Sequence, residues 1–188
     1  PWGSLGLLDV PAPPFSADPT GVRDSTAALQ HAVDFGRWHS LAVYVPAGEY
    51  RVTRTIVGVQ TARALSTGHV PGPLPKHFTP DFLLDGVSSR YVPNYLRGAG
   101  SASAILVVPP RTPFFANASS PRAVVDFRYT NPLGRTEPNA QYNTAIVSLG
   151  VRIGEHNAGA VGFRLRGAQG SGLEDVRVDF AGGYAPDA

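Results

Sequence analysis

Acidic and basic side chains occupy alternate positions in several apolar segments of this chain. Residues 151–153, 161–166 and 176–180 place an apolar residue at every second position, which is the pattern of a β-strand buried on one face. The intervening side chains, with two from a similar segment at 123–127 and just after it, would point outward: Asp126, Arg128, Arg152, Arg164, Arg166, Arg177 and Asp179. Glu174 and Asp175 begin a strand, where the alternation leaves open which of them faces outward.

This outward strip permits two interpretations. It could bind an anionic or hydroxylated polymer, with Arg152, Arg164 and Arg177 as the substrate-binding candidates. It could also be a solvated face on which Asp179 offsets stacked arginines, because cross-strand charge pairs are ordinary surface features. For the pattern taken alone we favour the solvated face.

The strands that carry the strip are expected to form a stack. Val-Arg-Ile at 151 and Val-Arg-Val at 176 recur 25 residues apart, with a third short strand between them. Short strands, glycine-rich turns and a recurrence of that size predict the coils of a solenoid. In that register Arg152 would stack one coil away from Arg177, and an ordinary β-sandwich is the alternative fold.

A turn, a helix and two strands near the N-terminus would begin the stack. Asp18 starts a Pro-Thr-Gly turn, and Asp24 or Ser25 is a suitable N-cap for a helix over 26–35 that stops at Gly36. Asp18 and Asp24 are therefore expected to shape the backbone rather than to catalyse. The further segments expected are an extended arm over 1–14, strands over 41–45 and 50–56, and a proline-rich surface excursion over 59–94.

Composition restricts the class of protein. The 188 residues include 21 Gly and 18 Pro but only 16% charged residues, which favours a turn-rich β architecture. Net charge is +2 with a single lysine, so a nucleic-acid-binding function is not expected. There is no Cys, the histidines lack metal-ligand spacing, and no apolar run reaches the ~18 residues of a membrane span. The chain starts at Pro1 and lacks Met, so we expect a mature, trimmed or partial chain.

The N-terminal segment resembles a known superfamily. Asp18-Pro-Thr-Gly-Val-Arg-Asp-Ser-Thr-Ala-Ala-Leu-Gln30, then Val43-Tyr-Val-Pro-Ala-Gly-Glu-Tyr50, is similar to the signature of pectate-lyase-like right-handed parallel β-helix proteins. The segment 159–176 looks like a coil of the same superfamily, and the nearest likeness is to the family 55 glycoside hydrolases, which are exo-β-1,3-glucanases. The likeness covers roughly 15–56 and 144–180. It departs from the signature at Ala17 and at the proline-rich lead-in over 11–15.

The resemblance implies a fold with an N-terminal capping α-helix and a chemistry on polysaccharides. Glycoside hydrolysis needs two carboxyl groups, for which the candidates are Asp126, Glu174 and Asp179. A polysaccharide lyase is the second possibility, and only that chemistry would call for Ca²⁺; otherwise no cofactor or metal is expected. The glucanases that this chain resembles carry their general acid in a later β-helix, so the chain alone is expected to be inactive.

The resulting prediction is a single mostly β domain or fragment over 1–188. It comprises an arm, cap and first strands over 1–56, the excursion over 57–94, and coils over 95–188 that are open at the C-terminal end. Its function would be that of the N-terminal part of a secreted or cell-surface glycoside hydrolase acting on β-glucan-type chains. The alternative is a non-catalytic extracellular module for adhesion or assembly. Expected partners are a polysaccharide and, at the open end, further coils, a second chain or a copy of itself; Asn117 in Asn-Ala-Ser is a possible glycosylation site.

Overall fold

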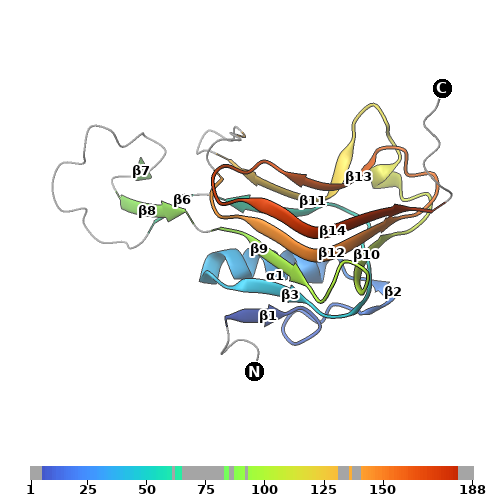
Figure 1. The fold of residues 1–188 in the computed structure, drawn as a ribbon, viewed down its shortest axis with the longest axis horizontal. Coiled ribbons are helices and arrows are strands. Elements are labelled where there is room, and N and C mark those ends of the chain that lie inside the picture. The colour runs from blue at the N-terminus through green and yellow to red at the C-terminus, as the bar shows by residue number, and fades with distance from the viewer. Residues whose placement is uncertain are drawn as a thin grey trace.

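The computed structural model describes residues 6–60, 62–64, 83–84, 87–91, 93–130, 136 and 141–181. This part of the chain is mostly β-structure with one α-helix, α1 (Thr26–His39), and a short 3₁₀-helix, η3 (Pro113–Phe115) (Figure 1). The strands are β1 (Leu7–Asp9), β2 (Thr20–Asp24), β3 (Ala42–Val45), β4 (Gly48–Arg51), β5 (Ile56–Gln60), β6 (Ala62–Ala64), β7 (Leu83–Leu84), β8 (Val87–Tyr91), β9 (Tyr95–Gly98), β10 (Ala104–Val108), β11 (Arg122–Tyr129), β12 (Ala145–Ile153), β13 (Ala160–Leu165) and β14 (Gly172–Phe180).

The chain passes repeatedly through two parallel sheets. The large sheet has the order β1-β3-β9-β12-β10-β4-β2, with β14 paired to β12, and the side sheet has the order β13-β11-β5. Three successive passes, β3-β4-β5, β9-β10-β11 and β12-β13, each supply the large sheet and then the side sheet. All of these pairs are parallel, so strands from one pass lie directly on strands of the next. The expected mostly β fold of stacked parallel strands is confirmed.

A sharp bend divides the large sheet along its length. The first residues of β12 pair with β9 and its last residues pair with β10, and Ser148 between them has a left-handed φ of 52°. Asp175 stands opposite Ser148 in β14 and has φ 45°. The two bends therefore stack and hold β14 in register on β12.

That register corrects the expected repeat. Val151 pairs with Val178, 27 residues later, rather than with Val176 as the 25-residue recurrence predicted. Arg152 accordingly lies beside Asp179 and not beside Arg177. The error of two residues leaves each side chain on its expected face, because side chains alternate with a period of two.

The interior is filled from both sheets. Val151, Leu106 and Tyr50 follow one another across β12, β10 and β4 and are almost fully buried, and Val125 and Phe127 close the core from β11. β14 continues this inward column with Val178. Three of its inward residues remain exposed, namely Leu173 at 44%, Val178 at 37% and Phe180 at 42%, whereas Val176 is half-buried against the core.

Helix α1 packs Leu29, Ala32 and Val33 inward beside β5 and β3. The helix runs past the expected stop, so Gly36 lies inside it. A glycine suits this position because a Cβ there would come within 2.9 Å of Leu41 O and Val43 Cγ2. Ser40, in the left-handed conformation, ends the helix instead. At its start Asp24 accepts the N–H of Thr26, as a cap was expected to do, whereas Ser25 makes no capping bond.

Three further expectations change. The N-terminal arm contributes β1, which pairs with β3. The strand expected over 50–56 is two strands, because the chain turns from the large sheet to the side sheet between Arg51 and Ile56. Within the proline-rich excursion, β6, β7 and β8 form antiparallel pairs; residues 61, 65–82, 85–86 and 92 lie outside the described residues.

Candidate ligand-binding face

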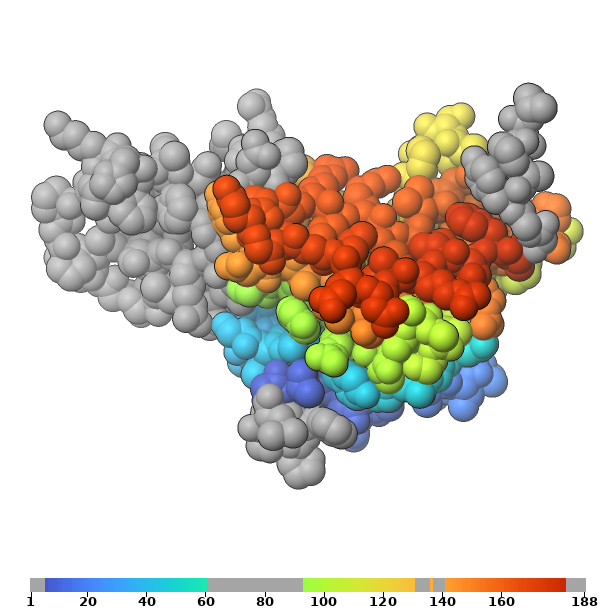
Figure 2. Space-filling view, viewed as in Figure 1, coloured from blue at the N-terminus to red at the C-terminus, as the bar shows by residue number. Residues whose placement is uncertain are grey.

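On the outer face of the large sheet, in the part of each strand that precedes the bend, one side chain from each stacked strand lies in a single row. The residues that share this register are Asp9, Tyr44, Arg97, Val147 and Glu174, here called the central row. Their sequence neighbours Leu8, Val43, Leu96 and Ile146 are buried in the core, so the central row points the other way. This face looks toward the viewer in Figures 1 and 2, where β1 to β14 run from blue to red.

Tyr95 and Ala145 form the next row along the same strands, two residues before Arg97 and Val147. Arg97 and Glu174 are exposed, while Tyr44 and Tyr95 are half-buried. Neighbouring strands lie about 4.8 Å apart, so two phenol rings, a guanidinium and a carboxylate share one surface. Arg97 and Asp9 were not anticipated, although the alternation Tyr-Leu-Arg-Gly at 95–98 would have assigned Arg97 to the outer face.

A cluster of small polar groups borders the central row at the bend. The Ser101 hydroxyl donates to Asp175 Oδ1 at 2.6 Å, and hydrogen bonds from the Ser101 and Ser148 side chains lower the pKa of Asp175 below its usual range. The bend shows which of Glu174 and Asp175 faces outward, a point that the alternation left open. Glu174 belongs to the outward row, while Asp175 is the bend residue and its carboxylate is held in ionised form by the serines.

Beyond the bend the same face carries charges that are already paired. Arg152 Nη1 lies 2.6 Å from Glu49 Oε1, and the two residues reach each other across β10. Arg177 binds Asp179 at 2.8 Å within β14. Arg152, Arg177 and Asp179 are thus brought together on one surface as predicted, and their roles in catalysis or substrate binding stay predictions.

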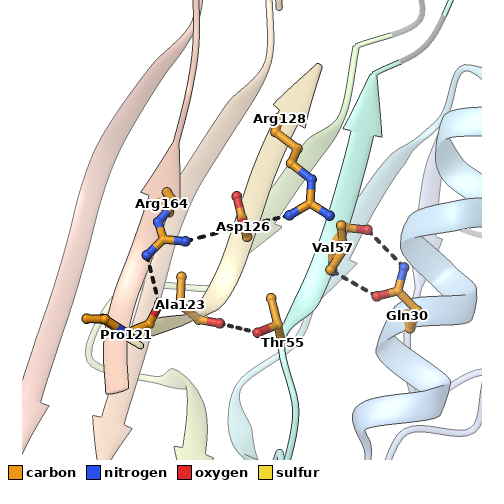
Figure 3. A network of polar contacts seen from close by, with 8 residues as sticks. All are labelled: Gln30, Thr55, Val57, Pro121, Ala123, Asp126, Arg128 and Arg164. Atoms are coloured by element: carbon orange, nitrogen blue, oxygen red, sulfur yellow. Dashed lines mark hydrogen bonds and ion pairs between the residues drawn. The ribbon is translucent and has the colours of Figure 1, made fainter. Parts of the chain in front are cut away.

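Asp126 and Arg164 lie elsewhere, on the side sheet. The Asp126 carboxylate is only 5% exposed and lies between Arg128, at 2.9 Å, and Arg164, at 3.7 Å (Figure 3). Asp126 alternates with the core residues Val125 and Phe127, which places the three charges on the outer side of that sheet. Asp126 is separated from Glu174 and Asp179 by the fold, and its catalytic role stays a prediction.

Hydrolysis of a glycosidic bond requires two carboxyl groups about 5–9.5 Å apart. Burial raises the pKa of Asp9, as a general acid requires, but Asp9 is four strands from Glu174, or about 19 Å at about 4.8 Å per strand. Glu174 and Asp175 are sequence neighbours, and of the described carboxylates at the central row and bend they are the two that lie close together. The arrangement is suited to holding a ligand, with Glu174 and Asp175 as its acidic groups.

The expected glycosylation site lies on the surface. Asn117 is exposed in the turn before β11, where its side chain accepts the N–H of Ser119. Among the described residues no group of three or more His, Cys, Asp or Glu side chains could hold a metal ion. No helix in the described part of the chain is long and apolar enough to cross a membrane.

Comparison with known proteins adds one family likeness. Residues 12–65 match the family model described as rhamnogalacturonase A/epimerase, pectate lyase-like. This segment holds β2, α1, β3, β4, β5 and β6, so the likeness predicted for the N-terminal signature is confirmed at the level of the pectate-lyase-like group. The match covers less than a third of the chain, and the finer likeness to family 55 glycoside hydrolases stays a prediction. No curated protein matches the sequence.

Two solved structures show a remote similarity. One is the catalytic unit of a thermostable GH87 α-1,3-glucanase from Streptomyces thermodiastaticus, at 17% identity and a TM-score of 0.36, over 81% of this chain and 24% of that one. The other is the A-module of a mannuronan C-5 epimerase from Azotobacter vinelandii, at 19% identity and a TM-score of 0.37, over 92% of this chain and 50% of that one. The chain thus spans about a quarter of the first of these two structures and half of the second.

Proposed function

We propose that the chain is the N-terminal part of a secreted polysaccharide-processing protein with a right-handed parallel β-helix, and that the outer face of its large sheet binds the glycan. The observation that carries the proposal is the central row with Tyr95 beside it. Aromatic rings that present an apolar face, together with charged groups that hydrogen-bond hydroxyls, are the chemistry by which proteins hold sugars on an open surface. The family match at the cap supports the choice of a saccharide as ligand.

In this proposal the side chains of the central row have distinct roles. Tyr95 and Tyr44 offer ring faces to sugar rings, and Arg97, which is exposed between them and Glu174, donates to sugar oxygens. The ligand would be a β-glucan-type chain laid across the strands. Hydrolysis would be the reaction of the whole protein, with Glu174 and Asp175 contributing at most part of the acid–base machinery, so this chain is expected to bind without cleaving.

Calorimetric titration with short β-1,3-gluco-oligosaccharides tests the proposal. The expected result is binding that Arg97→Ala and Tyr95→Ala each weaken by about fivefold or more, because a buried hydrogen bond or a stacked ring contributes about 1 kcal/mol. Arg166→Ala, which removes an arginine of the side sheet, is the matched control and should leave the affinity unchanged. Equal weakening by Arg97→Ala and Arg166→Ala, or no binding at all, would overturn it.

A second function is favoured by a different observation. The inward-facing residues Leu173, Val178 and Phe180 of β14 are exposed by 37–44%, although they continue the buried columns of β12. Such an edge would serve a non-catalytic module that assembles end to end, with β14 pairing to a further strand. Light scattering over a range of concentrations tests it. Assembly that Val178→Glu abolishes supports this function, and a monomer at every concentration contradicts it.

A further inference from the structure

One exposed turn carries a motif that the proposed glycan-binding face does not use. Residues 116–122 lead from η3 into the first residue of β11, and each of them is exposed, whereas Phe115 before them and Ala123 after them are buried. The turn projects from the body of the molecule next to the start of β11 (yellow in Figures 1 and 2). It contains Asn117-Ala-Ser119, which matches the tripeptide Asn-x-Ser/Thr that accepts N-linked glycans.

Both ends of this turn are anchored. Phe115 is fully buried, and the Arg122 guanidinium lies over the Phe114 ring, 4.2 Å from its centroid. Phe115 O accepts the Gly159 N–H at 2.9 Å, and Gly159 O accepts the Arg122 N–H at 2.8 Å. A Cβ at residue 159 would lie 2.2 Å from Asn117 O, so the glycine lets the turn rest directly on the chain before β13. The exposed residues therefore project from a fixed base.

The conformation of the turn leaves the side-chain nitrogen of Asn117 available. Asn117 Oδ1 accepts the Ser119 N–H at 3.0 Å, and Asn117 O accepts the Ser120 N–H at 3.2 Å. Asn117 Nδ2 makes no hydrogen bond with the described residues, and Asn117 is exposed. Nδ2 is the atom to which an N-linked glycan is attached, so the oxygen of this amide is engaged by the turn while its nitrogen faces solvent.

The other asparagines of the chain do not combine these properties. The sequence contains six asparagines, and Asn117 is the one that has Ser or Thr two positions later. Asn94 and Asn157 are only 2% and 6% exposed, and Asn157 Nδ2 donates to two backbone carbonyls. A sugar chain needs a solvated attachment point, because its hydroxyls would lose their hydrogen bonds with water inside a packed core. The motif thus falls on an asparagine that meets this requirement.

We propose that Asn117 carries an N-linked glycan when the protein passes through a eukaryotic secretory pathway. The inference rests on the secretion included in the proposed function, but it does not depend on the ligand of the central row. In the reaction Asn117 Nδ2 forms a bond to the anomeric carbon of an oligosaccharide held on a lipid pyrophosphate. The bond from that carbon to the pyrophosphate breaks, the pyrophosphate leaves with the electron pair, and the amide releases one proton to a base.

The glycan would leave the central row open. The turn that holds Asn117 leads into β11 of the side sheet and rests on the chain before β13 of the same sheet, whereas the central row lies on the large sheet. The affinity for a gluco-oligosaccharide should therefore be the same before and after the glycan is removed.

Secretion of the full chain from yeast, with a leader peptide that is removed on export, tests the modification by intact mass spectrometry. We expect the mass of the wild-type chain to increase by one oligosaccharide, which peptide-N-glycosidase removes to leave an aspartate at position 117. Ser119→Ala breaks the motif but keeps the Ser119 N–H bond to Asn117, so this variant should fold and lack the glycan. Ser119→Thr should keep the glycan, as should the matched control Ser120→Ala, which lies just outside the motif.

A wild-type chain that is secreted without a glycan would overturn the proposal. A glycan that persists in Ser119→Ala, or that peptide-N-glycosidase cannot remove, would do the same. Calorimetric titration of the secreted protein with a β-1,3-gluco-oligosaccharide separates this inference from the proposed function. A glycosylated protein that binds no sugar would contradict the function alone, and an unmodified protein that binds the sugar would contradict the modification alone.

Discussion

Gln30 of helix α1 binds both backbone groups of Val57 in strand β5. Its Nε2 donates to Val57 O at 2.9 Å, and its Oε1 accepts the Val57 N–H at 2.8 Å (Figure 3). These are the two bonds that a neighbouring strand would make. Among the described residues no further strand pairs with β5, so the Gln30 side chain terminates the side sheet at this edge. The helix therefore caps the stack through hydrogen bonds as well as through its apolar face.

Replacement of Gln30 by Ala should destabilise the protein by about 1–3 kcal/mol, because the Val57 N–H and C=O lose their partners; the better helix propensity of Ala offsets only a few tenths of that. Chemical denaturation monitored by circular dichroism measures the loss. Gln169→Ala, at an exposed loop residue whose backbone alone makes a bond, is the matched control. Equal stability of both variants would refute the capping role of Gln30.

Gly98 is expected to be indispensable at the bend of the large sheet. A Cβ at residue 98 would lie 2.2 Å from Ser148 O, a backbone atom that cannot move without breaking the stacked bends. Gly98→Ala should therefore cost about 2–4 kcal/mol, whereas Gly172→Ala, whose Cβ would meet nothing within 4 Å, should be neutral or slightly stabilising. Thermal unfolding of the two variants in parallel decides the point, and similar melting temperatures would contradict it.

Asp18 should make the stability of the protein depend on pH in the acid range. The Arg23 N–H, the Thr20 hydroxyl and the Thr20 N–H all donate to its carboxylate and lower its pKa from 3.8 to about 2. A carboxyl whose pKa is lower in the folded state stabilises that state when ionised, so its contribution is complete above pH 4 and disappears as the pH falls toward 2.

The test compares Asp18→Asn with wild type between pH 7 and pH 2. The variant should be less stable at neutral pH, and the difference should shrink as the pH falls through this window. Thr20→Val, which removes the hydroxyl but keeps both backbone donors, should give a smaller loss of the same sign. A stability difference that does not change with pH would show that the hydrogen bonds to the charged form are not the cause.

Removing the Asp126 carboxylate should lower the stability of the protein, whatever its effect on catalysis. Asp126→Ala leaves Arg128 and Arg164 side by side without their shared partner, and we expect a loss of about 1–3 kcal/mol, moderated by solvent at the two arginines. A double-mutant cycle with Arg164→Ala measures the coupling between them. A coupling energy of zero would mean that the Asp126–Arg164 pair contributes nothing to stability, and Asp126 would then behave as a free acidic group.

The sequence was most informative where local chemistry decides the structure. Side-chain hydrogen bonding accounts for the turn at Asp18 and for the start of α1 after Asp24. The period of a strand accounts for the alternation around Val151 and Val178. The helix end was missed because Gly36 serves close packing against Leu41 and Val43, a tertiary contact that has no local signal.

The functional face was harder to predict. Tyr44, Arg97 and Glu174 come from three separate passes of the chain, and their alignment depends on strand pairing that the sequence does not encode locally. The register of β14 was misjudged because similar triplets at 151 and 176 suggested a repeat, whereas the stacked bends at Ser148 and Asp175 set the actual pairing. Arg164 and Arg177 alternate alike in sequence, yet they lie on different sheets.

The central claim is that a glycan binds across the outer face of the large sheet. The most direct measurement is a titration of isotopically labelled protein with a short β-1,3-gluco-oligosaccharide, followed by nuclear magnetic resonance. We predict that the amide signals of Tyr44, Tyr95, Arg97 and Glu174 shift together and saturate with one affinity, while those of Asp126 and Arg164 on the side sheet stay in place. Shifts confined to the side sheet, or no shifts at saturating sugar, would contradict the claim.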